Sequence, residues 1–320
     1  MPVTRKQYQV VAESPAVGGR VDRVIQTLSG LSRAQVVGLF DHGCVTVNGT
    51  PCDVPGQPVA VGDLVELAYY PGQRYHAAPK GKRPPGFGII YEDRQLIVVD
   101  KPASMLTVPA HPGEAFTLVD RLSDYLRRCG GARQAFTVHR LDRGVSGLLV
   151  FGKTAEWASR IRAQFAEHKP ERLYFALVAG RVASNQGTWA SRLTTDRSLR
   201  RHSTDDEEDD GEHAVTHFAI EQRWADASLA RIWLETGRRN QIRVHFAEAG
   251  HPVIGDDRYR PRLAAHPRWP FGRLALHARA LGLTHPATGE PLRWESPLPM
   301  EFDRFIAPPR STARPDRPQS

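Results

Sequence analysis

The stretch HRLDRGVSGLLVFGKT, residues 139–154, contains two patterns that predict different folds and different chemistry. From Gly147 onward it reads Gly, any four residues, Gly, Lys, Thr, which matches the phosphate-binding loop of nucleotide hydrolases. Such a loop needs small residues so that successive backbone amides can point at one anion. The residues between the glycines, Leu148 to Phe151, instead favour a buried extended strand. The sequence therefore predicts a buried strand here and argues against a nucleotide hydrolase.

A carboxylate stands directly before this strand. Asp142 lies between Arg140 and Arg143 and is followed by Gly144. Neighbouring arginines keep a carboxylate ionised, which suits either a structural ion pair or a group that acts at a sugar carbon. From this segment alone, the structural ion pair is the simpler interpretation.

Strand patterns outnumber helical patterns over residues 89–306, which we interpret as one domain. Apolar or alternating runs predict strands at 96–101, 146–151, 171–180, 214–224 and 228–237, and a hairpin at 281–294. Helical spacing predicts helices at 116–129, 155–168 and 240–249. Because these elements do not alternate regularly, we predict an α+β fold with a mixed, largely antiparallel sheet flanked by helices.

Residues 1–70 form a second, smaller unit in the sequence. The patterns predict helices at 20–29 and 32–40, a strand ending in an Asn-Gly turn at 44–49, and a hairpin-like pair at 58–70. We expect a small α/β domain here, followed by an extended linker at 71–88, which is rich in Pro, Gly and basic residues. Two further segments are predicted to be disordered, the acidic loop at 203–212 and the tail at 307–320.

Composition restricts the class of protein. The net charge of +8 favours a polyanionic partner, although charge alone is equally compatible with a basic soluble surface. The cysteines have no metal-ligand spacing, and His213 and His217 lie four apart on a predicted strand, where that spacing makes no helical metal pair. We therefore expect no metal and no cofactor. The absence of an apolar run long enough to span a membrane predicts a cytoplasmic protein.

The quoted stretch resembles the signature of the RluA-type pseudouridine synthases. Further segments resemble that family in the same order along residues 89–300, among them IVVDKPASMLTVPA, ERLYFALVAG, LETGRRNQIRVHFAEAGHPVIGDDRY and LALHARALGLTHPATGEPLRWESPLP. Residues 18–68 are similar to the RNA-binding domain of ribosomal small-subunit protein four, through RVDRVI, SRAQVV, GCVTVNG and VAVGDLVEL.

This resemblance implies an enzyme that detaches uracil from ribose at nitrogen, turns the base and rejoins it through carbon 5. It implies that Asp142 is the catalytic aspartate, that Tyr174 stacks on the base and assists proton removal, and that Arg243 pairs with the aspartate. Arg140 would enter the space that the flipped base leaves. No cofactor is implied, and we expect a monomer.

For the first domain the resemblance implies RNA contacts through its basic helical face. Arg20, Arg23 and Arg33 are the candidate contacts, although each could be an ordinary surface arginine. The RNA partner is open: large-subunit ribosomal RNA is our first expectation and transfer RNA the alternative. A non-catalytic RNA-binding protein is the other class, which the presence of Asp142, Tyr174 and Arg243 disfavours.

Two positions depart from the family pattern. Val145 stands where the family usually has Thr, and Asn240 stands where it usually has His before QIR. Neither change removes a candidate catalytic group. We expect them to alter loop packing or a phosphate contact.

Overall fold

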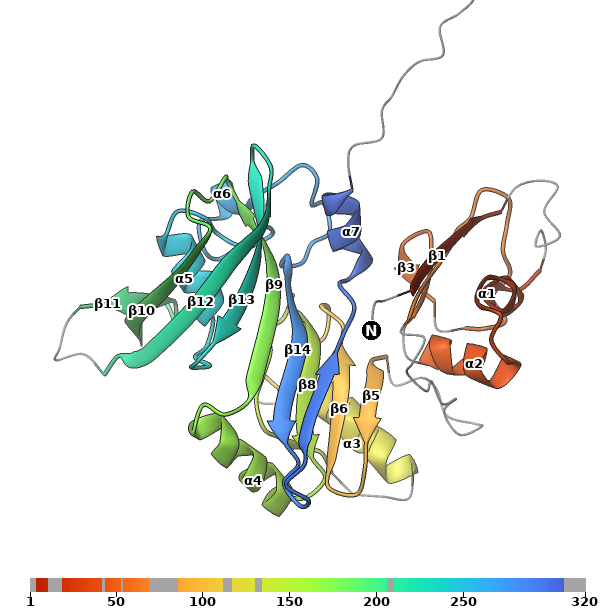
Figure 1. Ribbon diagram of the computed structural model, residues 1–320, viewed down its shortest axis with the longest axis horizontal. Helices are drawn as coiled ribbons and strands as arrows, with labels where there is room; N and C mark the ends of the chain where they lie inside the picture. The colour runs from red at the N-terminus through yellow and green to blue at the C-terminus, as the bar shows by residue number, and fades with distance from the viewer. Residues whose placement is uncertain are drawn as a thin grey trace, which may run out of the picture.

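The computed structural model describes residues 4–10, 19–41, 44–52, 54–69, 86–111, 117–129, 134–205 and 210–307. Three predicted segments fall wholly or partly outside these ranges: the linker 71–88, the acidic loop 203–212 and the tail 307–320. Figure 1 shows a small sheet with two helices beside a much larger sheet, and a short helix, α7, between them.

The small sheet has the order β1-β4-β2-β3. The elements of this unit are β1 (Thr4–Gln9), α1 (Val21–Ser29), α2 (Arg33–Asp41), β2 (Val45–Val47), β3 (Thr50–Pro51) and β4 (Leu64–Tyr69). Both predicted helices are present, and α1 ends at Gly30, which adopts the left-handed conformation that the position requires. The unit has its own buried cluster, which includes Ile25, Leu39 and Val65.

Two details of this unit differ from the sequence prediction. The segment 58–70 does not form a hairpin with itself: only β4 is a strand, and it pairs with β2 and β1 instead. The strand β1 was not predicted, because its residues TRKQYQ are mostly polar and alternate only between half-buried and exposed positions. A strand at the edge of a sheet needs few apolar residues, so its sequence signal is weak.

The large sheet is mixed, as predicted. Its strands are β5 (Gly88–Glu92), β6 (Leu96–Lys101), β7 (Phe136–Thr137), β8 (Ser146–Gly152), β9 (Glu171–Ala179), β10 (Gln186–Thr195), β11 (Arg201–Thr204), β12 (Glu212–Arg223), β13 (Ala227–Leu234), β14 (Leu276–Thr284) and β15 (Pro291–Glu295). The order is β11-β10-β12-β13-β9-β14-β8-β6-β5, with β15 beside β14 and β7 beside β8. Among the described strands, β8 and β14 are parallel and the other pairs are antiparallel. The α+β prediction is confirmed.

Helices cover both faces of the sheet around β8. Their bounds are α3 (Leu118–Arg128), α4 (Ala155–Ala166), α5 (Gln241–Glu248), α6 (Pro261–Ala264) and α7 (Met300–Ile306). Leu149 and Phe151 share a buried cluster with residues of α3, whereas Leu148 and Val150 share one with Ile161 of α4. Every residue of β8 is therefore buried, which explains the unbroken apolar run in the sequence.

The glycines of the apparent phosphate loop have structural roles in this strand. Gly147 has a φ of 116°, and a Cβ there would collide with the backbone of Ala278 on β14. A Cβ at Gly152 would collide with the backbone of Ala158 on α4. Lys153 pairs with Glu92 at 2.6 Å. The structure therefore confirms the predicted strand. The two glycines allow close packing against β14 and α4, and the lysine forms an ion pair.

Replacing Gly147 by Ala should destabilise the protein by about 2–4 kcal/mol, because the new methyl group adds overpacking to left-handed strain. Urea unfolding measures the change. Gly250→Ala is the control, since its φ is also positive, at 86°, but nothing lies within 4 Å of the added carbon. That variant should lose only about 1–2 kcal/mol. Equal losses would show that packing against Ala278 does not matter.

The helix α7 joins the two units. Arg5 on β1 pairs with Asp303 at 2.8 Å, Arg304 contacts Glu66 on β4 at 3.5 Å, and the Thr46 hydroxyl donates to the sulfur of Met300. These contacts place the small sheet against α7, as Figure 1 shows. Within the described ranges, no helix is long and apolar enough to cross a membrane.

Candidate active site

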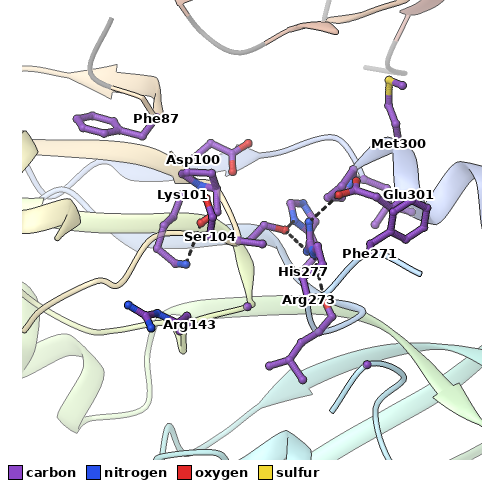
Figure 2. A pocket seen from close by; sticks show the side chains of 18 of the residues that line it. Phe87, Asp100, Lys101, Ser104, Arg143, Phe271, Arg273, His277, Met300 and Glu301 are labelled. Atoms are coloured by element: carbon purple, nitrogen blue, oxygen red, sulfur yellow. Dashed lines mark hydrogen bonds and ion pairs between the residues drawn. The ribbon is translucent and has the colours of Figure 1, made fainter. Parts of the chain in front are cut away.

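A cavity of about 1170 Å³ lies between the small unit and the large sheet. Phe40 and Thr46 line it from the small unit, and Arg140, Asp142 and Arg243 line it from the large one. Figure 2 shows part of its wall, with Lys101 and Arg143 on one side and Met300 of α7 on the other. The cavity is therefore formed by both units of the chain.

Asp142 stands on the turn that leads into β8. The turn is fixed by a backbone hydrogen bond from Gly144 to Ala103 at 2.8 Å and by Thr107, whose hydroxyl donates to the Leu141 carbonyl at 2.7 Å. The carboxylate Oδ2 of Asp142 accepts a hydrogen bond from Arg243 Nη1 at 3.1 Å. Its side chain remains 20% exposed, so the carboxylate is held firmly while part of it faces the cavity.

Arg243, on α5, connects Asp142 to a buried carboxylate. Its guanidinium donates to both oxygens of Asp256, at 2.7 and 2.9 Å. The Asp256 side chain is fully buried and also accepts backbone N–H bonds from Arg258 and Tyr259. Burial would lower the pKa of Arg243, but the hydrogen bonds and negative charges of Asp256 and Asp142 raise it above its ordinary value. Arg243 is therefore a fixed cation beneath Asp142.

Tyr174 is buried in the middle of β9 and is only 8% exposed. Burial raises the pKa of its hydroxyl; the positive charge of Arg172 opposes this effect, and the negative charge of Asp142 adds to it. The side chain is therefore a neutral phenol at neutral pH. The influence of Asp142 places the two residues in one electrostatic environment.

The predicted arginines fall into two groups. Arg140 is exposed in the wall of the cavity, next to Asp142. Arg20, Arg23 and Arg33 are exposed on the small unit and are not among the residues that line the cavity. Arg20 also pairs with Asp22 at 2.8 Å. The structure thus brings Arg140, Asp142 and Arg243 together and leaves the N-terminal arginines on a separate surface.

Sequence reasoning did not identify the charged residues beneath the cavity. Burial, with help from the charge of Arg273, lowers the pKa of Lys101 to about 7, and its ammonium donates to the carbonyls of Pro102 and Met105. Burial raises the pKa of Asp100 to about 6, although its hydrogen bond from Ser296 opposes this. Asp256 was also missed. The signal available for it was a pair of aspartates that follows a short apolar run and a glycine, PVIG.

The two residues that depart from the family pattern, Val145 and Asn240, lie in different surroundings in the structure. Val145 is 2% exposed and belongs to the main hydrophobic cluster, so it affects loop packing. Asn240 begins α5 and lies beside Asp142 and Tyr259.

Comparison with known proteins agrees with this geometry. The family model described as RNA pseudouridylate synthase matches residues 95–248, and the S4 domain model matches residues 19–65. The chain is 34% identical to the ribosomal large subunit pseudouridine synthase D of Pseudomonas aeruginosa, over 92% of this chain and 93% of that protein. It is 33% identical to an uncharacterized RNA pseudouridine synthase of Bacillus subtilis, over 94% and 97% of the two chains.

Solved structures agree at the level of the fold. Human RNA Pseudouridylate Synthase Domain Containing 4 superposes with a TM-score of 0.56 at 21% identity, over 68% of this chain and 91% of that one. Human RNA Pseudouridylate Synthase Domain Containing 1 gives a TM-score of 0.55 at 23% identity. Together with the ordered segments around Asp142, these matches identify the chain as a member of the RluA-type RNA pseudouridine synthases, enzymes that isomerise uridine in RNA.

Proposed function

We propose that this enzyme modifies uridine in large-subunit ribosomal RNA and that Asp142 is the group that acts at the ribose. The observation that carries the site assignment is the partly exposed Asp142 carboxylate, held by Arg243 at the wall of the cavity between the two units. The ribosomal target rests on relatives such as the Pseudomonas aeruginosa protein, whose name specifies the ribosomal large subunit.

The chemistry requires a carboxylate close to the anomeric carbon. As the bond between N1 and C1′ breaks, positive charge develops on the sugar, and Asp142 would stabilise or capture it. The base then turns, a bond forms between C5 and C1′, the C5 hydrogen leaves as a proton, and N1 gains a proton. The product has the same atoms as the substrate, so no oxidant or donor is consumed.

The other site residues would serve this reaction in different ways. Arg243 would hold the Asp142 carboxylate in place through the hydrogen bond at 3.1 Å. Tyr174 would stack on the uracil and assist proton removal. Its raised pKa disfavours the phenolate that would accept a proton directly, so its hydroxyl would assist as a hydrogen-bonding group. Arg140, exposed at the cavity wall, would occupy the space that the flipped base leaves in the RNA.

We further propose a division of labour along the chain. Residues 1–70 would bind RNA, 71–88 would link the units, and 89–306 would carry out catalysis. The match of residues 19–65 to the S4 domain supports the first assignment. We propose that the enzyme acts as a cytoplasmic monomer without a cofactor.

Mapping of pseudouridines in total RNA from cells with and without the gene tests the target. We expect one or more sites in large-subunit ribosomal RNA to disappear with the gene and to return when it is restored. Loss confined to transfer RNA would replace the ribosomal target with the alternative. Unchanged pseudouridine in both RNAs would contradict the proposed function.

The N-terminal arginines give a separate prediction. Changing Arg20, Arg23 and Arg33 together to Gln should lower the slope of log affinity against log salt by about 2–3, since each lost phosphate contact removes nearly one unit. Filter binding to a structured ribosomal RNA fragment at several salt concentrations measures the slope.

A charge-matched control distinguishes the loss of phosphate contacts from the loss of net positive charge. Arg160, Arg231 and Arg293 are similarly exposed, but each pairs with a glutamate on the large unit. Changing these three to Gln removes the same charge and should leave the slope nearly unchanged. If both triple variants lowered the slope equally, the first unit would make no specific phosphate contacts.

A further inference from the structure

We propose that Asn240 is a positioning residue for Asp142 and donates a hydrogen bond that fixes the orientation of its carboxylate. The inference rests on the proposed role of Asp142 and extends it to a position where this chain departs from the family pattern.

The backbone at Asn240 selects a particular class of residue. Asn240 is the N-cap of α5, with φ 59° and ψ 13°, in the left-handed region. Among residues other than Gly, Asn, Asp and His are the ones enriched there. Asn is also a good N-cap because its side chain can accept a backbone N–H of the helix, but here the side chain makes no such bond. Its amide is directed elsewhere.

Only one orientation of this amide satisfies its surroundings. With nitrogen toward Asp142, it donates to Oδ2 at 2.7 Å and lies 3.3 Å from Oδ1, while the amide oxygen accepts from the Tyr259 hydroxyl at 3.1 Å. The opposite orientation would place an oxygen 2.7 Å from a carboxylate oxygen. It would keep a bond from the amide nitrogen to the Tyr259 hydroxyl at 3.1 Å and gain a 3.4 Å contact from Arg243 Nη1, which is at the long limit for a hydrogen bond. Neither contact compensates for two oxygens at 2.7 Å.

Tyr259 fixes the same orientation from the other side. Its hydroxyl accepts a hydrogen bond from the backbone N–H of Arg201 at 3.2 Å, so its own hydrogen must find an acceptor. The Tyr259 side chain is buried, and the Asn240 amide oxygen is the acceptor within reach. With the amide turned the other way, the hydroxyl would face two donors.

These contacts give the Asp142 carboxylate two unequal oxygens. Oδ2 accepts from Arg243 at 3.1 Å and from Asn240 at 2.7 Å. Among the described residues, Oδ1 has only the longer approach of Asn240 at 3.3 Å. The pair of donors on Oδ2 prevents rotation of the carboxylate, and Oδ1 becomes the oxygen that can approach the ribose. Precise orientation of a reacting group is a large part of catalysis.

The test compares three substitutions at Asn240 in the full-length enzyme. Under single-turnover conditions with a saturating RNA fragment, Asn240→Ala should lower the rate constant for isomerisation by about 10- to 100-fold, the effect of one hydrogen bond to a charged group. Asn240→His should retain most of the rate, because His tolerates the left-handed backbone and can donate one N–H. Asn240→Asp should be at least as slow as Ala, because it places a second carboxylate beside Asp142.

Two further measurements distinguish positioning from folding and from binding. The Kd of Asn240→Ala for the RNA fragment should stay near the wild-type value, but its Tm should fall, because Ala is strained at a φ of 59°. Asn240→Gly removes the same amide without that strain, so it should keep a Tm near that of the wild type and lose as much of the rate as Asn240→Ala does. Tyr259→Phe removes the hydroxyl that orients the amide, so it should lower the rate less than Asn240→Ala does.

The possible results are separable. A wild-type rate for Asn240→Ala, an equal loss in the Ala and His variants, or a wild-type rate for Asn240→Gly would each overturn the positioning role. Asp142→Asn tests the proposed function independently. If Asp142→Asn is inactive and Asn240→Ala is not impaired, only the positioning role fails, whereas an active Asp142→Asn removes the mechanism on which it rests.

Discussion

Replacing Asp142 by Asn should lower the rate of isomerisation by about 10⁴-fold or more, as expected when the reacting group of covalent or charge-stabilised catalysis is removed. The amide has nearly the same shape as the carboxylate. It carries no negative charge, so it cannot stabilise the positive charge that develops on the ribose. RNA affinity should change little, because the phosphate contacts that dominate affinity lie elsewhere.

Tritium release from RNA labelled at uracil C5 measures this reaction directly, since the C5 hydrogen leaves when the new bond forms. The matched control is Asp257→Asn, which neutralises another carboxylate that lines the same cavity. It should keep activity close to that of the wild type. Substantial tritium release by Asp142→Asn, at a rate near that of the control, would refute the aspartate mechanism.

Replacing Arg243 by Met should both abolish activity and destabilise the fold, by about 3–5 kcal/mol. The guanidinium neutralises Asp256, whose side chain is fully buried. Without it, a buried carboxylate keeps its backbone N–H partners but loses its counter-charge. Asp142 also loses its partner at 3.1 Å, so the loss of activity should exceed what the lower stability explains.

A second variant separates these two effects. In Arg243→Met with Asp256→Asn, the buried charge is absent, so urea unfolding should show that much of the lost stability returns. Activity should not return, because Asp142 still has no cation beside it. A single Arg243→Met variant as stable as wild type would show that Asp256 does not depend on the arginine.

The sequence indicates the interior of the large sheet better than its edges. The strand β8 is buried on both faces, so its apolar run could only be a strand or a buried helix, and the flanking glycines favoured the strand. The strand β10 was not predicted, because most of its residues are exposed or half-buried and Leu193 is the one fully buried member. A strand with few buried apolar residues lacks the alternating pattern by which strands are identified in a sequence.

The candidate site was also predictable only in part from the sequence. Asp142 and Arg243 could be named because each lies in a segment that resembles the family. Their mutual contact joins residues 101 positions apart, and no periodicity reveals such a pairing. Asp256 and Tyr259 acquire their roles only through the turn that places them under α5, so their importance could be recognised only in the folded chain.

The contact between β1 and α7 has a consequence for biosynthesis. Arg5 and Asp303 are 298 positions apart, so at translation rates of about 5–20 residues per second α7 is made about 15–60 s after β1. During that interval the nascent chain lacks Met300 and Arg304, which line the cavity. The small unit has a hydrophobic cluster of its own and can fold as soon as it leaves the ribosome. The wall that it shares with the large sheet is completed only after α7 has been made.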